Sequence, residues 1–178
     1  MAKKAAATKA GTRWQDKLYI QLRLHGVSQF CYVPDAGHAI LIDRSLADPQ
    51  VHSIRLTTEE EGVAMLAGAD LGGARGVLLM QSSGLGNCVN FFSLVKGGRF
   101  PFVTLISMRG DFGEGNPWQL PMGQATEAVL TAMDFLPFRI ESELEVEPTV
   151  EAALTMAHKS NCAVAILLTQ KLLGAKAF

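Results

Sequence analysis

Cysteine is scarce in this chain of 178 residues, and the three cysteines present, Cys31, Cys88 and Cys162, lie far apart. No C-x-x-C motif occurs, so the sequence does not suggest a disulfide framework or a zinc site with thiolate ligands. The four histidines also lack the spacing that is typical of metal ligands. We therefore expect reduced cysteines in the core and no metal site made by this chain.

A strong net charge and a long apolar run are also absent. The formal net charge of −1 provides no field for nucleic acid or an anionic membrane, and no apolar run approaches the ~18 residues that a membrane-spanning helix needs. The basic, alanine-rich start lacks the apolar region of a secretory signal. We therefore expect a cytoplasmic protein with a mobile tail at 1–12, a folded domain at 13–178, and no contact with nucleic acid or membrane.

Apolar residues alternate along the chain between a helical period and short continuous runs. The helical pattern predicts helices at 14–25, 39–46, 59–74, 85–96, 124–133 and 148–159. The short runs predict strands at 30–33, 51–56, 77–81, 102–108, 138–140 and 163–169. Apolar strands separated by helices are typical of a parallel sheet that is buried on both faces. The sequence thus predicts a single doubly wound α/β domain with a six-stranded, mostly parallel sheet.

In a sheet of this kind, ligands bind at the carboxyl ends of the strands, near the point where the strand order reverses. The segments that follow four of the predicted strands hold the unusual residues of the chain; they are 34–38, 57–61, 82–87 and 109–122. Candidate functional residues are therefore expected in these four segments.

Three consecutive carboxylates, Glu59, Glu60 and Glu61, begin an apolar helix that contains glycine. Negative charge at a helix start is favourable by a few tenths to ~1 kcal/mol for each residue, which explains two of the three. Glu59 shares a helical stripe with Val63, so we expect its side chain to point inward. A buried carboxylate costs free energy unless it has a partner, and it could share a proton with a nitrogen atom of a ligand.

Two glycines, Gly84 and Gly86, stand between the strand at 77–81 and the next predicted helix. Glycine at such a position lets backbone N–H groups approach a ligand. As a dinucleotide motif the pattern is weak, because Val89 stands where a third glycine is needed, and the G-K-S/T of a Walker loop is missing. A ligand site and a simple tight turn are both open interpretations of this segment.

Two further candidates follow other strands. His38 is either an exposed loop residue or a proton donor or substrate contact. Arg109 ends an apolar strand, where it either holds an anionic substrate or is solvated.

Three motifs now combine: E-E-E-G-x-A-x-x-A-G-A from Glu59, M-Q-S-S-G-L-G-N-x-x-N from Met80, and an apolar strand that ends in S-M-R-G at Gly110. In this order they resemble the pyrimidine-binding domain of thiamine-diphosphate-dependent 2-oxo acid decarboxylases. The resemblance is to the sulfopyruvate decarboxylase alpha subunit and phosphonopyruvate decarboxylase family in particular. It extends from Trp14 to Leu168 and is most specific between Glu59 and Asn90.

The resemblance implies roles for individual residues. By its spacing of nine residues from Gly68, Glu59 matches the glutamate that bonds N1′ of the cofactor's aminopyrimidine. The residues implied on the cofactor's pyrimidine side are Glu59, Gln81, Ser82, Ser83, Gly84, Leu85 and Asn87. The turn at Val33-Pro34-Asp35 is similar to a substrate-side loop of the family. Asp35, His38 and Arg109 are the candidate substrate contacts, and Glu59 and His38 the candidate catalytic residues.

One departure from the family pattern concerns the partner. A thiamine-diphosphate enzyme needs a second domain whose G-D-G…N motif holds Mg²⁺ and the diphosphate, but this chain has only Gly110-Asp111-Phe112. The resemblance therefore implies a beta subunit that supplies the Mg²⁺ and diphosphate site, and an α2β2 or larger assembly. The glycine- and proline-rich loop at 110–123 also departs from the family forms, and it either closes over substrate, contacts the partner or is a plain surface loop.

The implied reaction converts sulfopyruvate, a small 2-oxo acid, to sulfoacetaldehyde and CO2. Phosphonopyruvate decarboxylase, or another thiamine-dependent decarboxylase or carboligase subunit, is the enzyme alternative. The alternative without enzyme activity is a flavodoxin-like nucleotide-binding regulatory domain, which rests on Gly84-Leu85-Gly86 alone.

Overall fold

The computed structural model describes residues 13–175, and in this range every strand pair of the sheet is parallel. The sheet has six strands in the order β2-β1-β3-β4-β6-β5. The strands are β1 (Val27–Tyr32), β2 (His52–Arg55), β3 (Arg75–Gln81), β4 (Phe102–Ser107), β5 (Leu136–Ile140) and β6 (Ala163–Leu168). The predicted α/β fold is confirmed, whereas the predicted tail at 1–12 lies outside the described residues.

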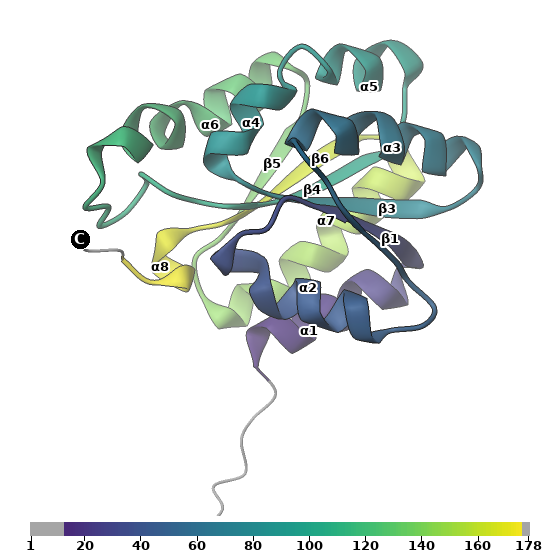
Figure 1. Cartoon of the computed structure of the whole chain (residues 1–178), viewed down its shortest axis with the longest axis horizontal. Coiled ribbons are helices and arrows are strands. Elements are labelled where there is room, and N and C mark those ends of the chain that lie inside the picture. The colour runs from purple at the N-terminus through teal and green to yellow at the C-terminus, as the bar shows by residue number, and fades with distance from the viewer. Residues whose placement is uncertain (1–12, 176–178) are drawn as a thin grey trace, which may run out of the picture.

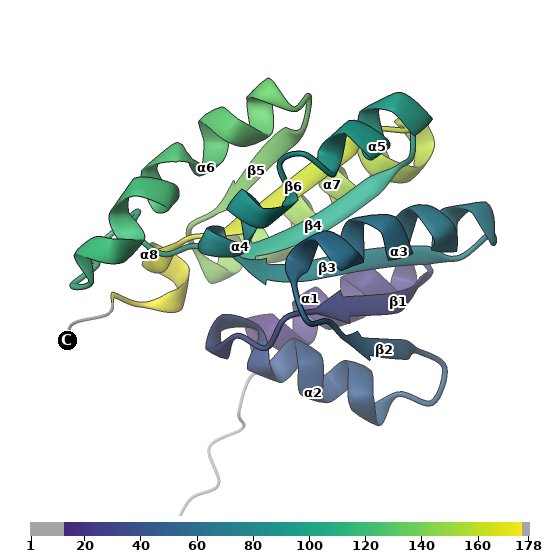
Figure 2. The same ribbon diagram turned by 45° about the horizontal axis from the view of Figure 1, so that its top comes forward.

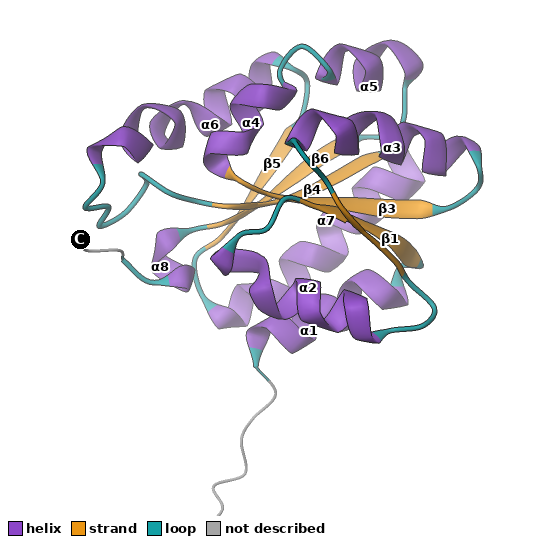
Figure 3. Ribbon diagram, in the orientation of Figure 1, coloured by secondary structure: helices purple, strands orange, loops and turns teal. Residues whose placement is uncertain are grey.

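Helices cover both faces of the sheet (Figure 1, Figure 2). One face carries α1 (Trp14–Leu24), α2 (Ala39–Ala47) and α7 (Val146–Ser160). The other face carries α3 (Glu59–Leu71), α4 (Ser82–Cys88), α5 (Phe92–Gly98) and α6 (Leu120–Ala132). The short helix α8 (Gln170–Leu173) follows β6, and the connections are otherwise loops and 3-10 turns (Figure 3). Among the helices of residues 13–175, none is long and apolar enough to cross a membrane.

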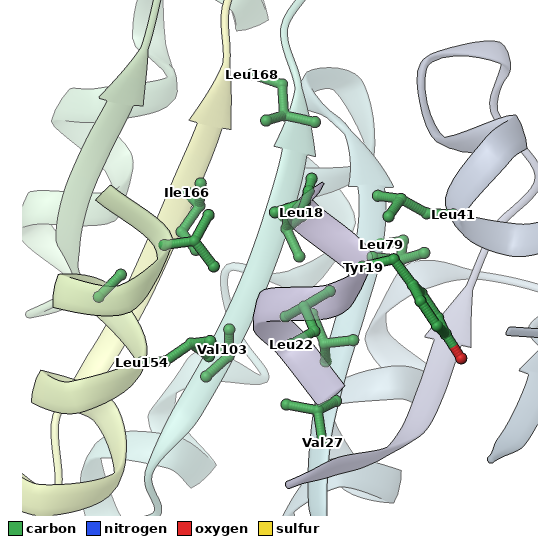
Figure 4. Close-up of a cluster of buried hydrophobic side chains, with 14 of the residues drawn as sticks. Leu18, Tyr19, Leu22, Val27, Leu41, Leu79, Val103, Leu154, Ile166 and Leu168 are labelled. Carbon is green, nitrogen blue, oxygen red and sulfur yellow. The ribbon is translucent and has the colours of Figure 1, made fainter. Parts of the chain in front are cut away.

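Each face of the sheet has its own apolar core. On the first face, α1 and α7 pack against the central strands, with Leu22, Leu154 and Val103 in the same cluster (Figure 4). On the second face, the rings of Phe92, Phe102 and Phe135 lie with centroids 4.4 to 6.0 Å apart. Because every residue of β4 is buried between these two cores, its sequence is nearly continuously apolar.

The predicted strands all exist, and the main differences concern helix boundaries. A single helix at 85–96 is wrong, because two short helices, α4 and α5, occupy 82–98 with a break at 89–91. The helix α6 begins at Leu120 rather than at residue 124, since proline is compatible with the first turn of a helix and Pro121 stands there. The helix α8 was not predicted.

The strand order reverses at β1, which pairs with β2 on one side and with β3 on the other. The segments that follow β1 and β3 therefore open beside each other at the carboxyl edge of the sheet. The first segment forms the 3-10 turn Ala36–His38, and the second forms α4. The Glu59 end of α3 lies beside α4, and Arg109 bonds to Ser82 of α4, so all four predicted segments meet at this edge.

Candidate active site

Glu59 is the first residue of α3, and only 9% of it is exposed. Its Oε2 atom accepts a 2.8 Å hydrogen bond from Nδ2 of Asn87 on α4. Within residues 13–175, Glu59 has no ion pair with a basic side chain. The structure therefore presents a buried carboxylate with one amide partner, and the predicted inward orientation of Glu59 is confirmed.

The other two glutamates of the cluster serve the start of the helix. Oε2 of Glu61 accepts a 2.9 Å hydrogen bond from the backbone N–H of Thr57. The Glu60 carboxylate accepts a hydrogen bond from the Thr58 hydroxyl, and this bond lowers the pKa of Glu60. Their acidic character is thus explained by local helix-start interactions, and Glu59 alone turns toward α4.

Gly84 is the point of closest approach between α4 and Glu59. A Cβ atom on Gly84 would lie 2.3 Å from Oε1 of Glu59 and 2.4 Å from its Cδ. A contact this short is not tolerated, so only glycine fits at this position while the carboxylate stays where it is. Gly84 is thus required by a close approach of a side chain to the backbone.

The predicted glycine turn at 82–87 is wrong in form, because helix α4 begins at Ser82 directly after β3. Gly84 and Gly86 therefore lie within the helix. Two residues of α4 have structural roles. Leu85 is fully buried in the core, and the buried Ser82 hydroxyl accepts a 3.1 Å hydrogen bond from the Arg109 backbone N–H. The physical reason for the error is that Gly84 serves packing against Glu59, which local sequence cannot reveal.

Cys88 of α4 lies near the Glu59 carboxylate. Cys88 is fully buried there, and burial together with the Glu59 charge raises the pKa of the Cys88 thiol. The thiol therefore stays protonated at neutral pH, as expected for a core cysteine. A ligand nitrogen that reached Glu59 would meet a carboxylate poorly screened by water, where a shared proton or hydrogen bond is strong.

Asp35, which follows β1, and Gln81, at the end of β3, are hydrogen-bonded to each other where the strand order reverses. Nε2 of Gln81 donates a 3.1 Å bond to Oδ1 of Asp35, and Oε1 of Gln81 accepts a 2.8 Å bond from the Ser83 hydroxyl. Oδ2 of Asp35 accepts bonds from the Gly37 N–H at 2.8 Å and the Ser107 hydroxyl at 2.7 Å. Burial opposes ionisation of Asp35, but the bonds from Ser107 and Gln81 outweigh it and lower the pKa of this carboxyl. Asp35 is therefore ionised at neutral pH.

His38 is fully buried, so the interpretation of this residue as an exposed loop residue is wrong. Its Nε2 lies 3.0 Å from the Met80 carbonyl oxygen, to which it donates a hydrogen bond. Burial lowers the pKa of His38, although the nearby Asp35 charge opposes this shift. The ring is therefore neutral at pH 7, and its role as a direct substrate contact or proton donor stays a prediction that requires the ring to become accessible.

Arg109 forms a two-point ion pair with Glu114, which we call the Arg109–Glu114 pair. Nε of Arg109 lies 2.5 Å from Oε2 of Glu114, and Nη2 lies 2.8 Å from Oε1. The Glu114 side chain is 1% exposed, and the bond from Arg109 is the main cause that lowers the pKa of Glu114 to about 2. A solvated Arg109 is therefore excluded, and any anionic substrate would meet a guanidinium that is already held by a carboxylate.

Two buried residues of this region, Glu114 and Gln170, were missed from the sequence. Gln170 is 1% exposed, and its Nε2 donates a 3.0 Å bond to Oε2 of Glu114. Its Oε1 accepts bonds of 3.1 Å from the N–H groups of Asp111 and Phe112. The only local signal was the polar Thr169-Gln170 pair at the end of an apolar strand, the same position in the sheet that singled out Asp35 and Arg109.

The predicted residues fall into two groups at the carboxyl edge. Glu59, Gly84 and Asn87 meet between α3 and α4. Asp35 and Arg109, together with Ser107 and Gln170, which were not predicted, line a pocket of about 210 Å³ beside α1 and α8, which we call the Asp35–Arg109 pocket. Ser82, which is bonded to the Arg109 backbone, connects the two groups. His38 and Glu59 do not line this pocket.

Among residues 13–175, no three His, Cys, Asp or Glu side chains lie together in a way that could hold a metal ion. Asp111, the acidic residue of Gly110-Asp111-Phe112, bonds instead to the Gln170 backbone N–H at 3.2 Å and pairs with Arg139.

Curated relatives of the chain carry a common name. A sulfopyruvate decarboxylase subunit alpha of Methanococcus maripaludis is 37% identical over 144 residues, which make up 80% of this chain and 86% of that protein. The protein of the same name from Methanothermobacter thermautotrophicus is 33% identical over 155 residues, 86% of this chain and 93% of that protein. A phosphonopyruvate decarboxylase of Streptomyces viridochromogenes is 38% identical over 111 residues, but the match covers 61% of this chain and only 28% of that protein.

The fold also has a solved counterpart, although no family model matches the chain. The structure of 2-oxoglutarate:ferredoxin oxidoreductase from Magnetococcus marinus, with 2-oxoglutarate, coenzyme A and succinyl-CoA bound, superimposes with a TM-score of 0.74. At 16% identity, over 90% of this chain and 29% of that one, the likeness concerns the fold alone. Identity of 33% or more over most of two full-length relatives is stronger evidence, and the chain belongs to the family of sulfopyruvate decarboxylase alpha subunits.

Proposed function

We propose that this chain is the alpha subunit of a two-subunit decarboxylase that converts sulfopyruvate to sulfoacetaldehyde and CO2 with thiamine diphosphate. The observation that carries the proposal is the buried Glu59 carboxylate, which Asn87 bonds and against which Gly84 packs. Family membership supports the same activity, since the relatives named above are sulfopyruvate decarboxylase alpha subunits.

The residues around Glu59 fit the aminopyrimidine of thiamine diphosphate. A carboxylate that is poorly exposed and free of ion pairs in residues 13–175 suits a hydrogen bond with a protonated ring nitrogen, N1′. The Asn87 amide fixes one carboxylate oxygen, so the orientation of the other is set as well. When bound, the cofactor supplies the carbon nucleophile that decarboxylation of a 2-oxo acid needs, and Glu59 would hold the proton at N1′.

The diphosphate and its Mg²⁺ are assigned to a partner subunit. The described chain has no cluster suited to the ion, and its Asp111 is occupied by Gln170 and Arg139. The phosphonopyruvate decarboxylase relative extends far beyond the region matched here, which is 28% of its length. A second domain of this sort, supplied here as a beta subunit, would complete the site, and an α2β2 or larger assembly stays a prediction.

The substrate is assigned to the Asp35–Arg109 pocket. Sulfopyruvate carries two anionic groups, and Arg109 is the cationic residue that lines this pocket. The Ser107 hydroxyl is already donated to Asp35, and the ionised Asp35 repels a second anion and so favours one orientation of the substrate. The chain's residues thus orient an anionic acid at the edge where Ser82 joins the pocket to the Glu59 group.

Phosphonopyruvate is the second candidate substrate, because a phosphonopyruvate decarboxylase is among the relatives. A phosphonate would use the same arginine contact as a sulfonate. The nucleotide-binding alternative has lost its basis, since Gly84 and Gly86 lie inside helix α4 and Gly84 is required by Glu59. A cytoplasmic location stays a prediction.

The experiment uses the complete chain, co-expressed with its beta subunit and supplied with thiamine diphosphate and Mg²⁺. Aldehyde release is measured from sulfopyruvate, phosphonopyruvate and pyruvate. The proposal expects the highest kcat/KM for sulfopyruvate and no activity of the chain without its partner. A higher kcat/KM for phosphonopyruvate than for sulfopyruvate would make phosphonopyruvate the substrate. Absence of activity with both sulfopyruvate and phosphonopyruvate would overturn the proposed function.

A further inference from the structure

The loop after β4 is closed around one buried carboxylate. Glu114 accepts five hydrogen bonds, from Nε and Nη2 of Arg109, the N–H groups of Gly110 and Asn116, and Nε2 of Gln170. Gly110 has φ +75°. A Cβ atom on this residue would lie 2.3 Å from the carbonyl oxygen of Gln119 and 2.9 Å from its carbonyl carbon. The loop is therefore tightly folded, and Glu114 sits at its centre.

Gln170 is the member of this network that belongs to a different part of the chain. It reaches the loop from the first residue of α8, and both ends of its side-chain amide bind the loop. Oε1 accepts hydrogen bonds from the N–H groups of Asp111 and Phe112, and Nε2 donates one to Glu114. Both Gln170 and Arg109 also line the Asp35–Arg109 pocket. The amide of Gln170 therefore acts on the oxygen of Glu114 that also binds Nε of Arg109.

We infer that Gln170 is a positioning residue, whose Nε2 fixes Glu114 so that Glu114 holds the Arg109 guanidinium in the orientation that receives the anionic group of the substrate. This inference rests on the proposed function for the nature of the substrate. A guanidinium is planar and directional, so a small rotation changes how it meets a sulfonate or carboxylate. Holding it in advance reduces the ordering that binding must supply.

The substitution Gln170→Glu tests this inference with a change of one group. It keeps an oxygen for the N–H groups of Asp111 and Phe112, but it replaces the donor to Glu114 by a second carboxylate oxygen. The matched control is Gln124→Glu, because Nε2 of Gln124 holds the same loop through the Gly110 carbonyl at 2.6 Å and has no bond to Glu114. Each variant loses one contact to the loop, but only Gln170→Glu disturbs the Arg109–Glu114 pair.

Two measurements on the assembled protein decide the matter. Steady-state kinetics with sulfopyruvate should show KM raised roughly tenfold in Gln170→Glu with kcat within about twofold, the pattern of lost binding rather than lost chemistry. Gln124→Glu should leave KM within about twofold. The Arg109 Nε–H signal in nitrogen-15 spectra should exchange faster with solvent in Gln170→Glu alone, and this readout does not depend on which acid is the substrate.

An unchanged rate of solvent exchange of the Arg109 Nε–H in Gln170→Glu would overturn the inference. An equal rise of KM in the two variants would also overturn it. Either result would mean that Gln170 serves only the structure of the loop. Failure of the proposed function is seen separately, as absence of aldehyde release from sulfopyruvate by the unsubstituted protein. In that event the Nε–H measurement still decides whether Gln170 positions Arg109.

Discussion

Gly84 lies so close to Glu59 that a Cβ atom at this glycine would stand 2.3 Å from Oε1. The relationship ties a residue of α4 to the first residue of α3, although the two are far apart in the sequence. With Asn87 bonded to the other oxygen, α4 fixes both sides of the carboxylate. Helix α4 is thus the element that decides where the Glu59 charge is presented.

The substitution Gly84→Ala should displace the Glu59 side chain. Its methyl group would overlap the carboxylate, so we expect the free energy of unfolding to fall by about 1–3 kcal/mol and the activity of the assembled enzyme to fall by at least an order of magnitude. Urea unfolding and aldehyde release measure the two effects.

Gly86→Ala is the control for this prediction. A Cβ there meets only Sδ of Met122, at 3.6 Å, which is an ordinary contact. Because alanine is the better helix former, Gly86→Ala should be neutral or stabilising by up to ~1 kcal/mol, and its activity should be kept. Equal losses in the two variants would contradict the assignment of Gly84 to Glu59.

Glu114→Gln should destabilise the chain by about 3 kcal/mol, because it leaves the Arg109 charge without its carboxylate in a nearly buried site. The loss of the Glu114 carboxylate should also remove part of the pH dependence of the free energy of unfolding. The pKa of Glu114 is about 2 in the folded chain against an ordinary value of 4.5, so its stabilisation is complete above pH 4.5 and is lost as pH falls toward 2. Unfolding free energies measured between pH 6 and 3 should therefore fall less in the variant; parallel curves would contradict the prediction.

His38 predicts a second pH dependence. Burial lowers the pKa of His38 below its ordinary value of 6.5, so the unfolded chain binds the proton more readily and stability falls as pH drops below 6.5. The contribution is at most about 1.4 kcal/mol per pH unit for one group. In His38→Gln, whose amide can still donate to the Met80 carbonyl, this part of the slope should be missing.

His158 titrates in the same direction and provides the background for that comparison. Burial lowers the pKa of His158 to about 4, and the nearby Arg75 and His25 charges add to the shift. Its slope is present in both proteins, so the difference between them reports His38. Identical slopes between pH 7.5 and 5 would show that His38 is not protonated on unfolding in this range.

Much of the fold was predictable from the sequence, because continuously apolar strands such as 102–108 can only be buried on both faces. The inward Glu59 was predictable from its helical stripe with Val63. Helices α4 and α6 were misplaced, since their starts depend on long-range packing of Gly84 and on a proline that the first helical turn accepts.

The buried polar residues were harder to predict. An exposed loop position was one of two interpretations of His38, but the residue is buried and bonds to Met80, 42 residues away. Glu114 was not a sequence candidate, and its carboxylate is held by Gln170, 56 residues further along the chain. Neither partner is adjacent in the sequence, so no local pattern contains the information.

The central claim is that the Glu59 carboxylate serves the cofactor, and Glu59→Gln tests it most directly. Glutamine keeps an oxygen for the Asn87 amide and nearly the same shape, so the melting temperature of the assembled protein should change by only about 2 °C, and Glu61→Gln, at the exposed third position of the same helix, should be fully active. We expect kcat for aldehyde release to fall at least roughly 100-fold in Glu59→Gln, the scale of a lost proton-transfer partner. Full activity of Glu59→Gln would contradict it.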